Sequence, residues 1–566
     1  MKTLKKWRVA PPPPDGFHLD LGGVSPVLAH SPLVNRLLFN RNIKSRAIAR
    51  AYLNPSPHGF TDPYLLPDME KAANRILRAV RNGERVGVFG DFDVDGLTAT
   101  AIIVRMVEDL GGTAFPFIPH REEDGHGLSM QAIKSFVDAG VQLIVTVDTG
   151  STAIEEVAAA NAAGVETIIT DHHLLDGELP AAYALVNPQS DEIAAPLTGA
   201  GVAFKLAQAV FGLSGKDVPY DLLVLAALGT IGDSGPLVGE NRLITRFGLE
   251  ELGRTRHPGL QALLDISRPP SANGRPTTEL IAYYVSPRLN APGRLGDAEP
   301  SLRILTTRDR EEAAVLAARL DSANNERKRL SEAVWEEVRP QISSRPAESN
   351  LIAVRCDGFP AGILGPLAGR LSEEYQSPAV AYSVTDGVAR ASMRSVPGFD
   401  LHSALTPLGT SLVRFGGHAA AAGFTVEIGY LDPVLAELER AATWSLMGRD
   451  QDIILNIDAE TPLSEMGASM WDFVAAMEPF GAANEKPVFM SRGVTPLEVK
   501  TMGAGGRHLR MTLEDEGRRV NAIGFGLGDA PLGRGRVDIA YELRSDTWKG
   551  RVRHELGLLD IRPAQR

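Results

Sequence analysis

The amino-acid sequence predicts an α/β protein: a parallel-sheet domain, a long connector helix, a second α/β domain and a C-terminal β-barrel. Three patterns indicate this fold class. Between residues 86 and 170, short β-branched runs alternate with stretches of helical length, which is typical of βαβ units. Residues 308–339 lack Pro and Gly, which predicts one long helix. Residues 450–566 hold short apolar runs separated by glycine-rich turns, which favours a small barrel.

The elements of the first domain follow one another in a regular order. Its strands are expected at 86–89, 114–118, 143–147 and 167–170. Its helices are expected near 97–110, 129–139 and 153–163. The predicted boundaries are 1–80 for a proline-rich lead-in with helices, 81–300 for the parallel-sheet domain, 301–345 for the connector helix, 346–445 for the second α/β domain and 446–566 for the barrel.

The composition is that of an ordinary soluble globular protein, with 44% hydrophobic and 23% charged residues. The single cysteine, Cys356, excludes an intrachain disulfide and fits a reducing compartment. No apolar run approaches the roughly 18 residues that a membrane helix needs. We therefore expect a cytoplasmic protein with no membrane partner.

The net charge of −12 does not by itself indicate a nucleic-acid-binding protein. A group of metal-binding carboxylates would contribute to that total, and an acidic protein can still carry a basic groove. Basic residues outnumber acidic ones from Lys500 to the C-terminus. This local excess fits a surface that contacts phosphates, and it fits a merely solvated basic face equally well.

Three acidic residues follow the first predicted strand, in the sequence Asp91-Phe92-Asp93-Val94-Asp95-Gly96. The spacing resembles a calcium-binding EF-hand loop, but the twelfth position is Ile102 and a strand precedes the loop, so we reject that interpretation. A solvated acidic turn is the other alternative. Three carboxylates crowded at a strand end repel one another unless a cation lies between them, so metal binding is the better prediction.

Acidic and histidine residues also follow the later apolar runs. Asp148 comes after 143–147, Asp171-His172-His173 after 167–170, and Asp233 after 222–231. The carboxyl ends of parallel strands meet at one edge of a sheet, so we expect these side chains to lie together. Carboxylate oxygens with imidazole nitrogen suit Mn²⁺ or Mg²⁺, and such a cluster can bridge two ions. The pattern predicts a phosphoester hydrolase.

The two adjacent histidines have different expected roles. After a buried strand they point in different directions, so one can bind metal while the other contacts a phosphate or orients water. Asp171 can fix the tautomer of a neighbouring ring.

Two segments of the second domain suit phosphate. Gly416 and Gly417 permit a close approach of the backbone, and the small residues after His418 could open a helix whose N-terminal amides bind phosphate. Small residues for tight packing are the alternative. Ser392 and Arg394 place a hydroxyl and a guanidinium close together, which also suits phosphate.

Taken together, these motifs resemble the DHH phosphoesterase superfamily with its DHH-associated C-terminal domain. Within it they are similar to the RecJ family of bacterial single-strand-specific DNA exonucleases. The resemblance runs from about residue 35 to the C-terminus. Further matching segments are 287–294, 325–327, 394–401, 479–484 and 508–510, of which the last two are similar to the family's OB-fold.

The resemblance implies 5′→3′ hydrolysis of single-stranded DNA to mononucleotides, with two Mn²⁺ or Mg²⁺ ions, in recombination and repair. By motif position, the metal ligands are Asp91, Asp93, Asp148, His172 and Asp233. His173 contacts the scissile phosphate, with Asp171 and Asp95 in support. The DNA-binding residues are Arg121, Arg288, Arg294, Ser392, Arg394, Gly416, Gly417 and His418.

The resemblance also implies that the barrel is an OB-fold that grips the strand, with single-strand-binding protein and a helicase as partners. Two other functions stay open. One is a phosphodiesterase for oligoribonucleotides or cyclic dinucleotides, or a polyphosphatase, on the same catalytic fold. The other is an inactive scaffold that only binds single strands. The barrel and the long connector argue against the first, and the retained carboxylates and histidines argue against the second.

Overall fold

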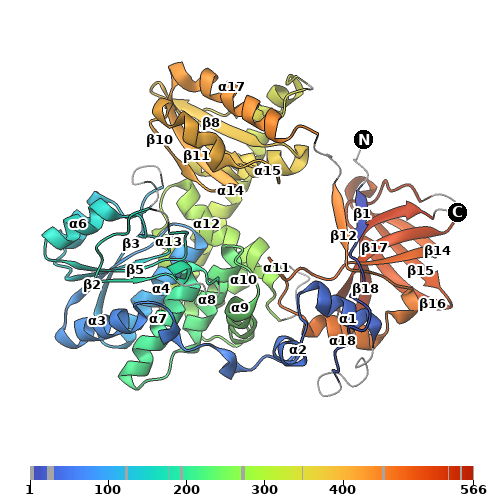
Figure 1. Ribbon diagram of the computed structural model, residues 1–566, viewed down its shortest axis with the longest axis horizontal. Helices are drawn as coiled ribbons and strands as arrows, with labels where there is room; N and C mark the ends of the chain where they lie inside the picture. Colours follow the sequence, from blue (N-terminus) through green and yellow to red (C-terminus); the bar gives the residue numbers. More distant parts are fainter. Residues whose placement is uncertain are drawn as a thin grey trace.

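The computed structural model describes residues 5–21, 31–121, 125, 127–175, 177–190, 196–268, 275–346, 348–448, 453–532, 535–548 and 551–564. Figure 1 shows three bodies. The largest is an α/β body, drawn in blue to green. A smaller α/β body in yellow and orange lies above it, and a barrel in orange and red lies to its side. The predicted fold class is confirmed.

The large body is built on a parallel sheet with the strand order β3-β2-β4-β5-β6. Every pair of neighbouring strands is parallel. The strands are β2 (Arg85–Phe89), β3 (Thr113–Phe117), β4 (Leu143–Val147), β5 (Glu166–Thr170) and β6 (Ala184–Val186). The central strands are apolar and β-branched because helices cover both faces of the sheet.

Helices pack on the two faces of this sheet as separate layers. On one face they share a core with Val88, Val145 and Ile168. On the other face they pack around Phe89, Ile144 and Ile169. The first layer contains α3 (Met69–Asn82), α4 (Val94–Asp109), α7 (Gly199–Ser214) and α8 (Tyr220–Gly232). The second layer contains α5 (Met130–Asp138) and α6 (Ile154–Ala162).

Further helices complete the large body beyond the sheet. They are α9 (Gly239–Leu252), α10 (Pro258–Ser267), α11 (Thr278–Leu280), the π-helical turn η5 (Ile281–Val285), α12 (Ser286–Leu295) and α13 (Glu299–Thr306). Within the described part of the chain, no helix is long and apolar enough to cross a membrane.

The predicted connector is the helix α14 (Arg310–Ser343), which has 34 residues and is therefore about 51 Å long. Leu316 and Leu320 near its start belong to the core of the large body. Val334 and Trp335 near its end belong to the core of the second α/β body. One helix therefore holds the two bodies at a fixed separation.

The second α/β body contains a mixed sheet with the order β10-β11-β9-β8-β7. Its strands are β7 (Ile352–Arg355), β8 (Ala379–Thr385), β9 (Val388–Arg394), β10 (Arg414–Gly417) and β11 (Ala421–Glu427). Strands β7 and β8 are parallel, and the other pairs are antiparallel. Its helices are α15 (Ala361–Tyr375), α16 (Leu401–Leu405) and α17 (Ile428–Ser445).

The prediction that a helix begins after Gly416 and Gly417 is wrong. Strands β10 and β11 form a hairpin in which Gly416 faces Gly423. Ala422, Phe424 and Val426 are buried while their neighbours are less so. This period of two matches a half-buried strand, and it outweighs the helix propensity of the alanines.

The C-terminal strands close into a five-stranded barrel, because β14 pairs with both β15 and β17. The strands of the ring are β14 (Phe489–Met502), β15 (His508–Asp515), β16 (Arg518–Gly524), β17 (Val537–Trp548) and β18 (Arg551–Pro563). The short strand β13 (Ala459–Glu460) pairs with β14 outside the ring. The helix α18 (Ala468–Ala476) packs against the barrel core.

The N-terminal segment is divided between two bodies. The helices α1 (Pro32–Asn40) and α2 (Arg46–Leu53) pack into the barrel core, whereas α3 belongs to the large body. The strand β1 (Lys6–Val9) pairs in parallel with β12 (Ile454–Ile457). The chain therefore begins against the barrel, and both ends lie near it in Figure 1.

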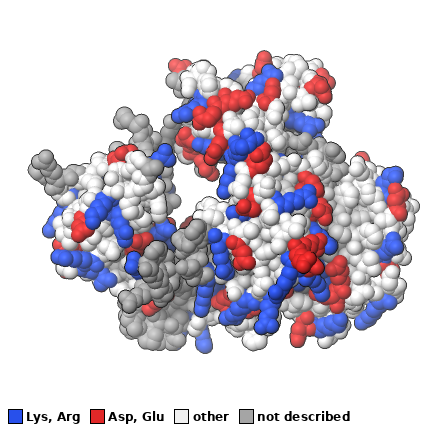
Figure 2. All heavy atoms as spheres, turned by 180° about the vertical axis from the view of Figure 1, so that it is seen from behind, with Lys and Arg blue, Asp and Glu red and all other residues white. Residues whose placement is uncertain are grey.

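Arg242 of α9 joins the large body to the barrel side. Its guanidinium donates hydrogen bonds to the carbonyls of Met477 at 3.0 Å and Glu478 at 2.7 Å. It also lies 4.0 Å from the centre of the Tyr52 ring. An opening remains between the barrel and the other two bodies, and Figure 2 shows it passing through the molecule.

Replacing Arg242 with Ala should loosen this joint. The two hydrogen bonds from a charged donor contribute roughly 1.5–3 kcal/mol each. We expect a melting temperature several degrees below wild type and faster proteolysis between the bodies. Arg254→Ala is the matched control, because Arg254 is an exposed residue whose ion pair joins it only to Glu251. Equal melting temperatures for the two variants would contradict a role for Arg242 in the contact between the large body and the barrel side.

Candidate active site

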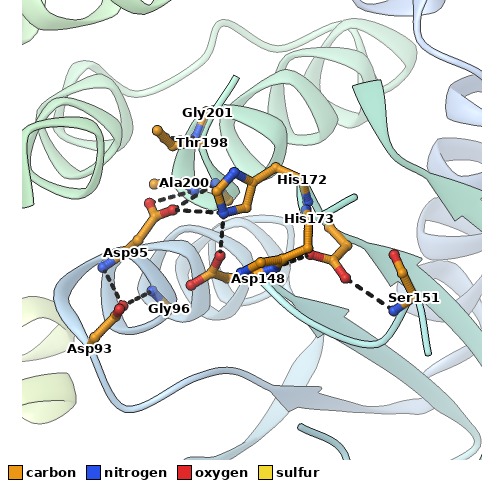
Figure 3. Close-up of polar contacts among 12 residues, drawn as sticks. Asp93, Asp95, Gly96, Asp148, Ser151, His172, His173, Thr198, Ala200 and Gly201 are labelled. Atoms are coloured by element: carbon orange, nitrogen blue, oxygen red, sulfur yellow. Dashed lines mark hydrogen bonds and ion pairs between the residues drawn. The ribbon is translucent and has the colours of Figure 1, made fainter. Parts of the chain in front are cut away.

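Acidic and histidine side chains meet at the carboxyl-end edge of the parallel sheet. Three groups of possible ligand atoms each lie within 4.8 Å of one another. They are Asp91 with Asp93 and Asp148, Asp95 with His172 and Asp233, and Asp148 with His172 and His173. In Figure 3, Asp95, Asp148 and His172 point toward one another. All five residues that the sequence predicts as metal ligands therefore lie in one cluster.

The pKa values of these carboxylic acids are raised. Burial and the neighbouring carboxylate of Asp91 raise the pKa of Asp93 to about 6. Burial and the charge of Asp95 raise the pKa of Asp233 to about 6. Burial and the charge of Asp93 raise the pKa of Asp95 to about 7. Burial and Asp95 raise the pKa of Asp148 well above its ordinary value. Such a crowd of acids is stable when ionised only beside compensating positive charge.

Asp148 and His172 provide the test of whether a cation fits. The Oδ1 atom of Asp148 is buried and has no hydrogen-bond partner among the residues that the structure describes. It lies 3.0 Å from Nε2 of His172, whose pKa is lowered by burial and by the charge of His173. A neutral imidazole nitrogen and a carboxylate oxygen that share no hydrogen bond are both electron-pair donors. Their convergence fits a divalent ion with oxygen and nitrogen ligands.

Asp148 occupies a constrained backbone position. Its φ of +58° lies in the left-handed region, which only a minority of non-glycine residues adopt. The first residue of α7, Gly199, lies directly against its side chain. A Cβ atom at Gly199 would come within 2.6 Å of Asp148 Oδ1. The close approach of α7 therefore requires glycine at this position.

His173 forms an ion pair with Asp171. Its Nδ1 lies 2.7 Å from Asp171 Oδ1, and this hydrogen bond raises the pKa of His173 to about 9. Burial favours the neutral acid at Asp171, but the hydrogen bond from His173 keeps the pKa of Asp171 below its ordinary value. The backbone N–H of Ser151 also donates to Asp171, at 3.0 Å. His173 is therefore a positively charged group at neutral pH.

Asp93 and Asp95 anchor helix N-termini. Asp93 Oδ1 accepts hydrogen bonds from the backbone N–H groups of Asp95 and Gly96 at the start of α4. Asp95 accepts hydrogen bonds from Gly199 at 2.7 Å and Ala200 at 2.9 Å, at the start of α7. These amides favour the ionised carboxylates. Asp95 thus fixes α7 beside Asp148, in addition to facing His172 at 3.9 Å.

The second α/β body reaches the cluster. The ring of His418 is stacked against His173, with centres 6.1 Å apart and an interplanar angle of 11°. Gly417, with a φ of +126°, lies at the turn that places His418 there. Gly416 belongs to strand β10 and would meet no atom within 4 Å if it carried a Cβ. Of these three predicted residues, His418 has the direct contact with the large body.

Four arginines gather beside the acidic cluster: Arg121, Arg294, Arg327 and Arg394. Burial, followed by the charges of the other three, lowers the pKa of Arg294 to about 10. Arg121 lies 3.9 Å from the centre of the Phe92 ring. None of the four forms an ion pair with a carboxylate in the part of the chain that the structure describes. Ser392 and Arg394 both lie against Gly365 of α15.

Arg288 is placed differently. Its guanidinium forms an ion pair with Asp321 of α14 at 2.8 Å and donates to the carbonyl of Tyr284.

Several residues of the site carry no recognisable signal in the sequence. Arg327 comes from the connector helix, in a segment that matched the family without an assigned role. Asn187 donates to the carbonyl of His173 at 3.0 Å and to Ser151 at 3.2 Å. No periodicity marks these positions, because they are defined only by contacts between distant elements.

Comparison with known proteins agrees with this architecture. A model of the DHH family N-terminal domain matches residues 85–230, a DHHA1 domain matches 348–443, and a RecJ OB domain matches 457–560. The single-stranded-DNA-specific exonuclease RecJ of Bacillus subtilis is 32% identical over 99% of this chain and 71% of its own length. That of Escherichia coli is 32% identical over 92% of this chain and 94% of its own length.

Solved structures give the same result. The crystal structure of RecJ from Thermus thermophilus in complex with Mn²⁺ superposes with a TM-score of 0.84 and 29% identity. The match covers 99% of this chain and 80% of that one. The structure of the same protein with Mg²⁺ gives a TM-score of 0.79. The chain therefore belongs to the RecJ family, and the predicted family is confirmed.

Metal binding should depend steeply on pH. Protons must leave Asp93 and Asp233, with pKa values of about 6, and Asp95, with a pKa of about 7, before these groups bind a cation. Because these values are raised, the acids stabilise the metal-free fold at low pH. That contribution is lost as pH rises through about 6 to 7.

We therefore expect the rise in melting temperature caused by Mn²⁺ to increase between about pH 5.5 and pH 7.5. Differential scanning fluorimetry with saturating MnCl₂ or with EDTA measures it. The EDTA curve should fall across the same window. A Mn²⁺-induced shift of constant size would contradict this electrostatic account.

Proposed function

We propose that this protein is a metal-dependent exonuclease that hydrolyses single-stranded DNA from the 5′ end and releases mononucleotides, in recombination and repair. The proposal rests on one observation, which is that two sets of charged side chains lie next to each other. A cluster of carboxylates and histidines lies beside four arginines that form no ion pair with a carboxylate among the described residues. The named relatives are single-stranded-DNA-specific exonucleases, which supports the same substrate for this chain.

The residues that would hold two Mn²⁺ or Mg²⁺ ions are Asp91, Asp93, Asp148, His172 and Asp233. Asp148 belongs to two of the candidate ligand groups, which makes it the best candidate to bridge both ions. When bound, such ions polarise the phosphate and lower the pKa of an attacking water.

His173 acts on the scissile phosphate directly. Because Nδ1 of His173 is engaged by Asp171, its Nε2–H is the group that can donate to a phosphate oxygen. The positive charge of His173 offsets the negative charge that accumulates in the transition state. Asp171 and Asn187 fix the orientation of His173, and Asp95 fixes α7 beside Asp148.

The arginines supply recognition of the 5′ end. A terminal phosphate monoester carries roughly 1.5–2 negative charges, whereas an internal diester carries one. Arg121, Arg294 and Arg394, with the Ser392 hydroxyl, therefore favour a terminal phosphate over an internal one. Arg327 extends this group from α14. A terminal phosphate held there places the next phosphodiester near the metal ligands, which explains release of one nucleotide at a time.

The barrel supplies the grip on the strand. The Phe525 ring is 57% exposed, with Arg544 5.4 Å and His508 5.3 Å from its centre. A shallow groove on the same barrel is lined by Lys500, Arg510 and Glu498, together with Met511, Thr512 and Asn521. Aromatic rings and basic side chains on an OB-fold bind unpaired bases and phosphates. We define Phe525, His508 and Arg544 as the barrel patch.

The proposal extends to location and partners. A buried thiol at Cys356 suits a reducing cytoplasm. A helicase that exposes single strands, and a single-strand-binding protein that keeps them open, would supply the substrate.

The decisive experiment compares 5′-phosphorylated and 5′-hydroxyl single strands in the presence of Mn²⁺. Wild type should release mononucleotides from the 5′ end. Arg394→Ala should lower cleavage of the phosphorylated strand by roughly 10- to 100-fold, the value of one charged hydrogen bond, and of the hydroxyl strand much less. Arg390→Ala is the matched control, because Arg390 is exposed on the same strand, β9.

Two results would overturn the proposal. An equal loss on both substrates would remove Arg394 from end recognition. A wild-type protein that leaves single-stranded DNA intact, but cleaves a cyclic dinucleotide or an oligoribonucleotide, would favour the small-substrate phosphodiesterase instead.

A further inference from the structure

One continuous helical segment runs from the barrel side of the large body to the arginine group. The helix α11, the π-helical turn η5 and the helix α12 follow one another without a break. The backbone at Leu280, Val285 and Ser286 is helical, so the chain stays helical through both joints. Short π-helical turns inside α-helices occur frequently at functional sites.

The first end of this segment contacts the barrel side. The Thr278 hydroxyl donates a hydrogen bond to the carbonyl of Phe480 at 2.8 Å. Glu279 lies close enough to Glu542 of β17 to contribute to its raised pKa, after the larger effect of burial. The start of the segment is therefore adjacent to β17.

The barrel patch lies next to this contact. Along β17, Tyr541 and Leu543 point into the barrel core, whereas Glu542 and Arg544 alternate with them and are only partly buried. Arg544 is thus two residues beyond Glu542 on the same face of the strand, and its guanidinium lies over Phe525. The barrel patch and the start of the helical segment are therefore both close to the same stretch of β17.

The second end of the segment carries Arg294, a member of the arginine group. Tyr283 precedes Arg294 by eleven residues along the helix, which corresponds to about 16 Å. The segment therefore spans the distance between the barrel side and the arginine group.

Two large aromatic side chains are exposed in the middle of this segment. Tyr283 is 74% exposed and Tyr284 is 39% exposed, whereas Ile281 and Val285 on either side are buried. Among the described residues, neither tyrosine ring packs on another ring or a cation, and neither hydroxyl has a hydrogen-bond partner. Adjacent tyrosines without a packing partner are not explained by the stability of the fold.

The backbone under these tyrosines is fixed. The Arg288 guanidinium donates to the Tyr284 carbonyl at 2.8 Å, and its ion pair with Asp321 joins the turn to α14. Rigid aromatic side chains bind a flat partner with little loss of conformational freedom.

We propose that Tyr283 and Tyr284 form a base-stacking shelf that guides the single strand from the barrel patch to the arginine group. This inference rests on the proposed function, because its ligand is the unpaired bases of the substrate strand. Stacking of one base on an aromatic ring strengthens binding by roughly 5- to 100-fold, whatever the base. Bases in a duplex are already stacked on their neighbours, so the shelf selects single strands without reading sequence.

The test measures how the effect of substituting the tyrosines depends on the length of the DNA strand. Tyr283→Ala and Tyr284→Ala, singly and together, should raise KM for long single strands by roughly 5- to 100-fold with little change in kcat. A strand needs about five stacked nucleotides to span the distance from Arg294. The rise in KM should therefore be small for shorter strands and reach its full size for strands long enough to reach both the arginine group and the tyrosines.

Matched variants distinguish a loss of base stacking from a general disturbance of the structure. Tyr283→Phe and Tyr284→Phe keep the ring and should keep wild-type KM. Tyr220→Ala, at a tyrosine 72% exposed at the start of α8, should have no effect. A loss of equal size for all strand lengths, or no loss for long strands, would overturn the shelf.

Binding measurements keep the shelf and the proposed function distinguishable. In an Asp148→Ala background, fluorescence anisotropy with a labelled single strand reports binding without hydrolysis. Weaker binding by the added tyrosine variants supports the shelf, and unchanged binding overturns it. Absence of single-strand hydrolysis by wild type would overturn the proposed function, while the anisotropy result would still decide the shelf.

Discussion

The site depends on the repulsion among buried carboxylates at the edge of the parallel sheet. Burial and mutual charge raise the pKa values of Asp93, Asp95, Asp148 and Asp233 together. The fold tolerates this cluster because amide groups at the starts of α4 and α7 donate to Asp93 and Asp95. The remaining charge is compensated only when cations bind. Affinity for divalent metal is therefore a direct consequence of how the sheet brings these side chains together.

The active site is completed across two bodies. The carboxylates come from the parallel sheet, but His418 and Arg394 come from the second α/β body. The long helix α14 packs into both cores, which fixes their separation. Arg327 on the same helix adds a charge to the arginine group. The residues proposed for catalysis and for end recognition are therefore divided between two bodies, and the barrel lies to the side of both.

Local patterns in the sequence predicted the elements and the clustering of acidic and histidine side chains at one sheet edge, because strand ends and acidic clusters are visible over a few residues. Contacts between distant segments were not predictable. The pairing of β1 with β12 divides the N-terminal segment between two bodies, and no local pattern indicates it. The segment after Gly416 and Gly417 forms a hairpin because burial alternates along β11. Arg288 matched the family motif, yet its guanidinium is engaged by Asp321, whereas Arg327 faces the arginine group.

The most direct measurement is the thermal stability of Asp148→Asn with EDTA at neutral pH, paired with its hydrolysis of single-stranded DNA in Mn²⁺. Asn is compatible with the left-handed backbone at this position. Removing one charge from the cluster should raise the melting temperature of the metal-free protein, while the stabilisation by Mn²⁺ and the hydrolysis are lost. A metal-free variant that melts below wild type, and still gains stability and activity from Mn²⁺, would contradict the account.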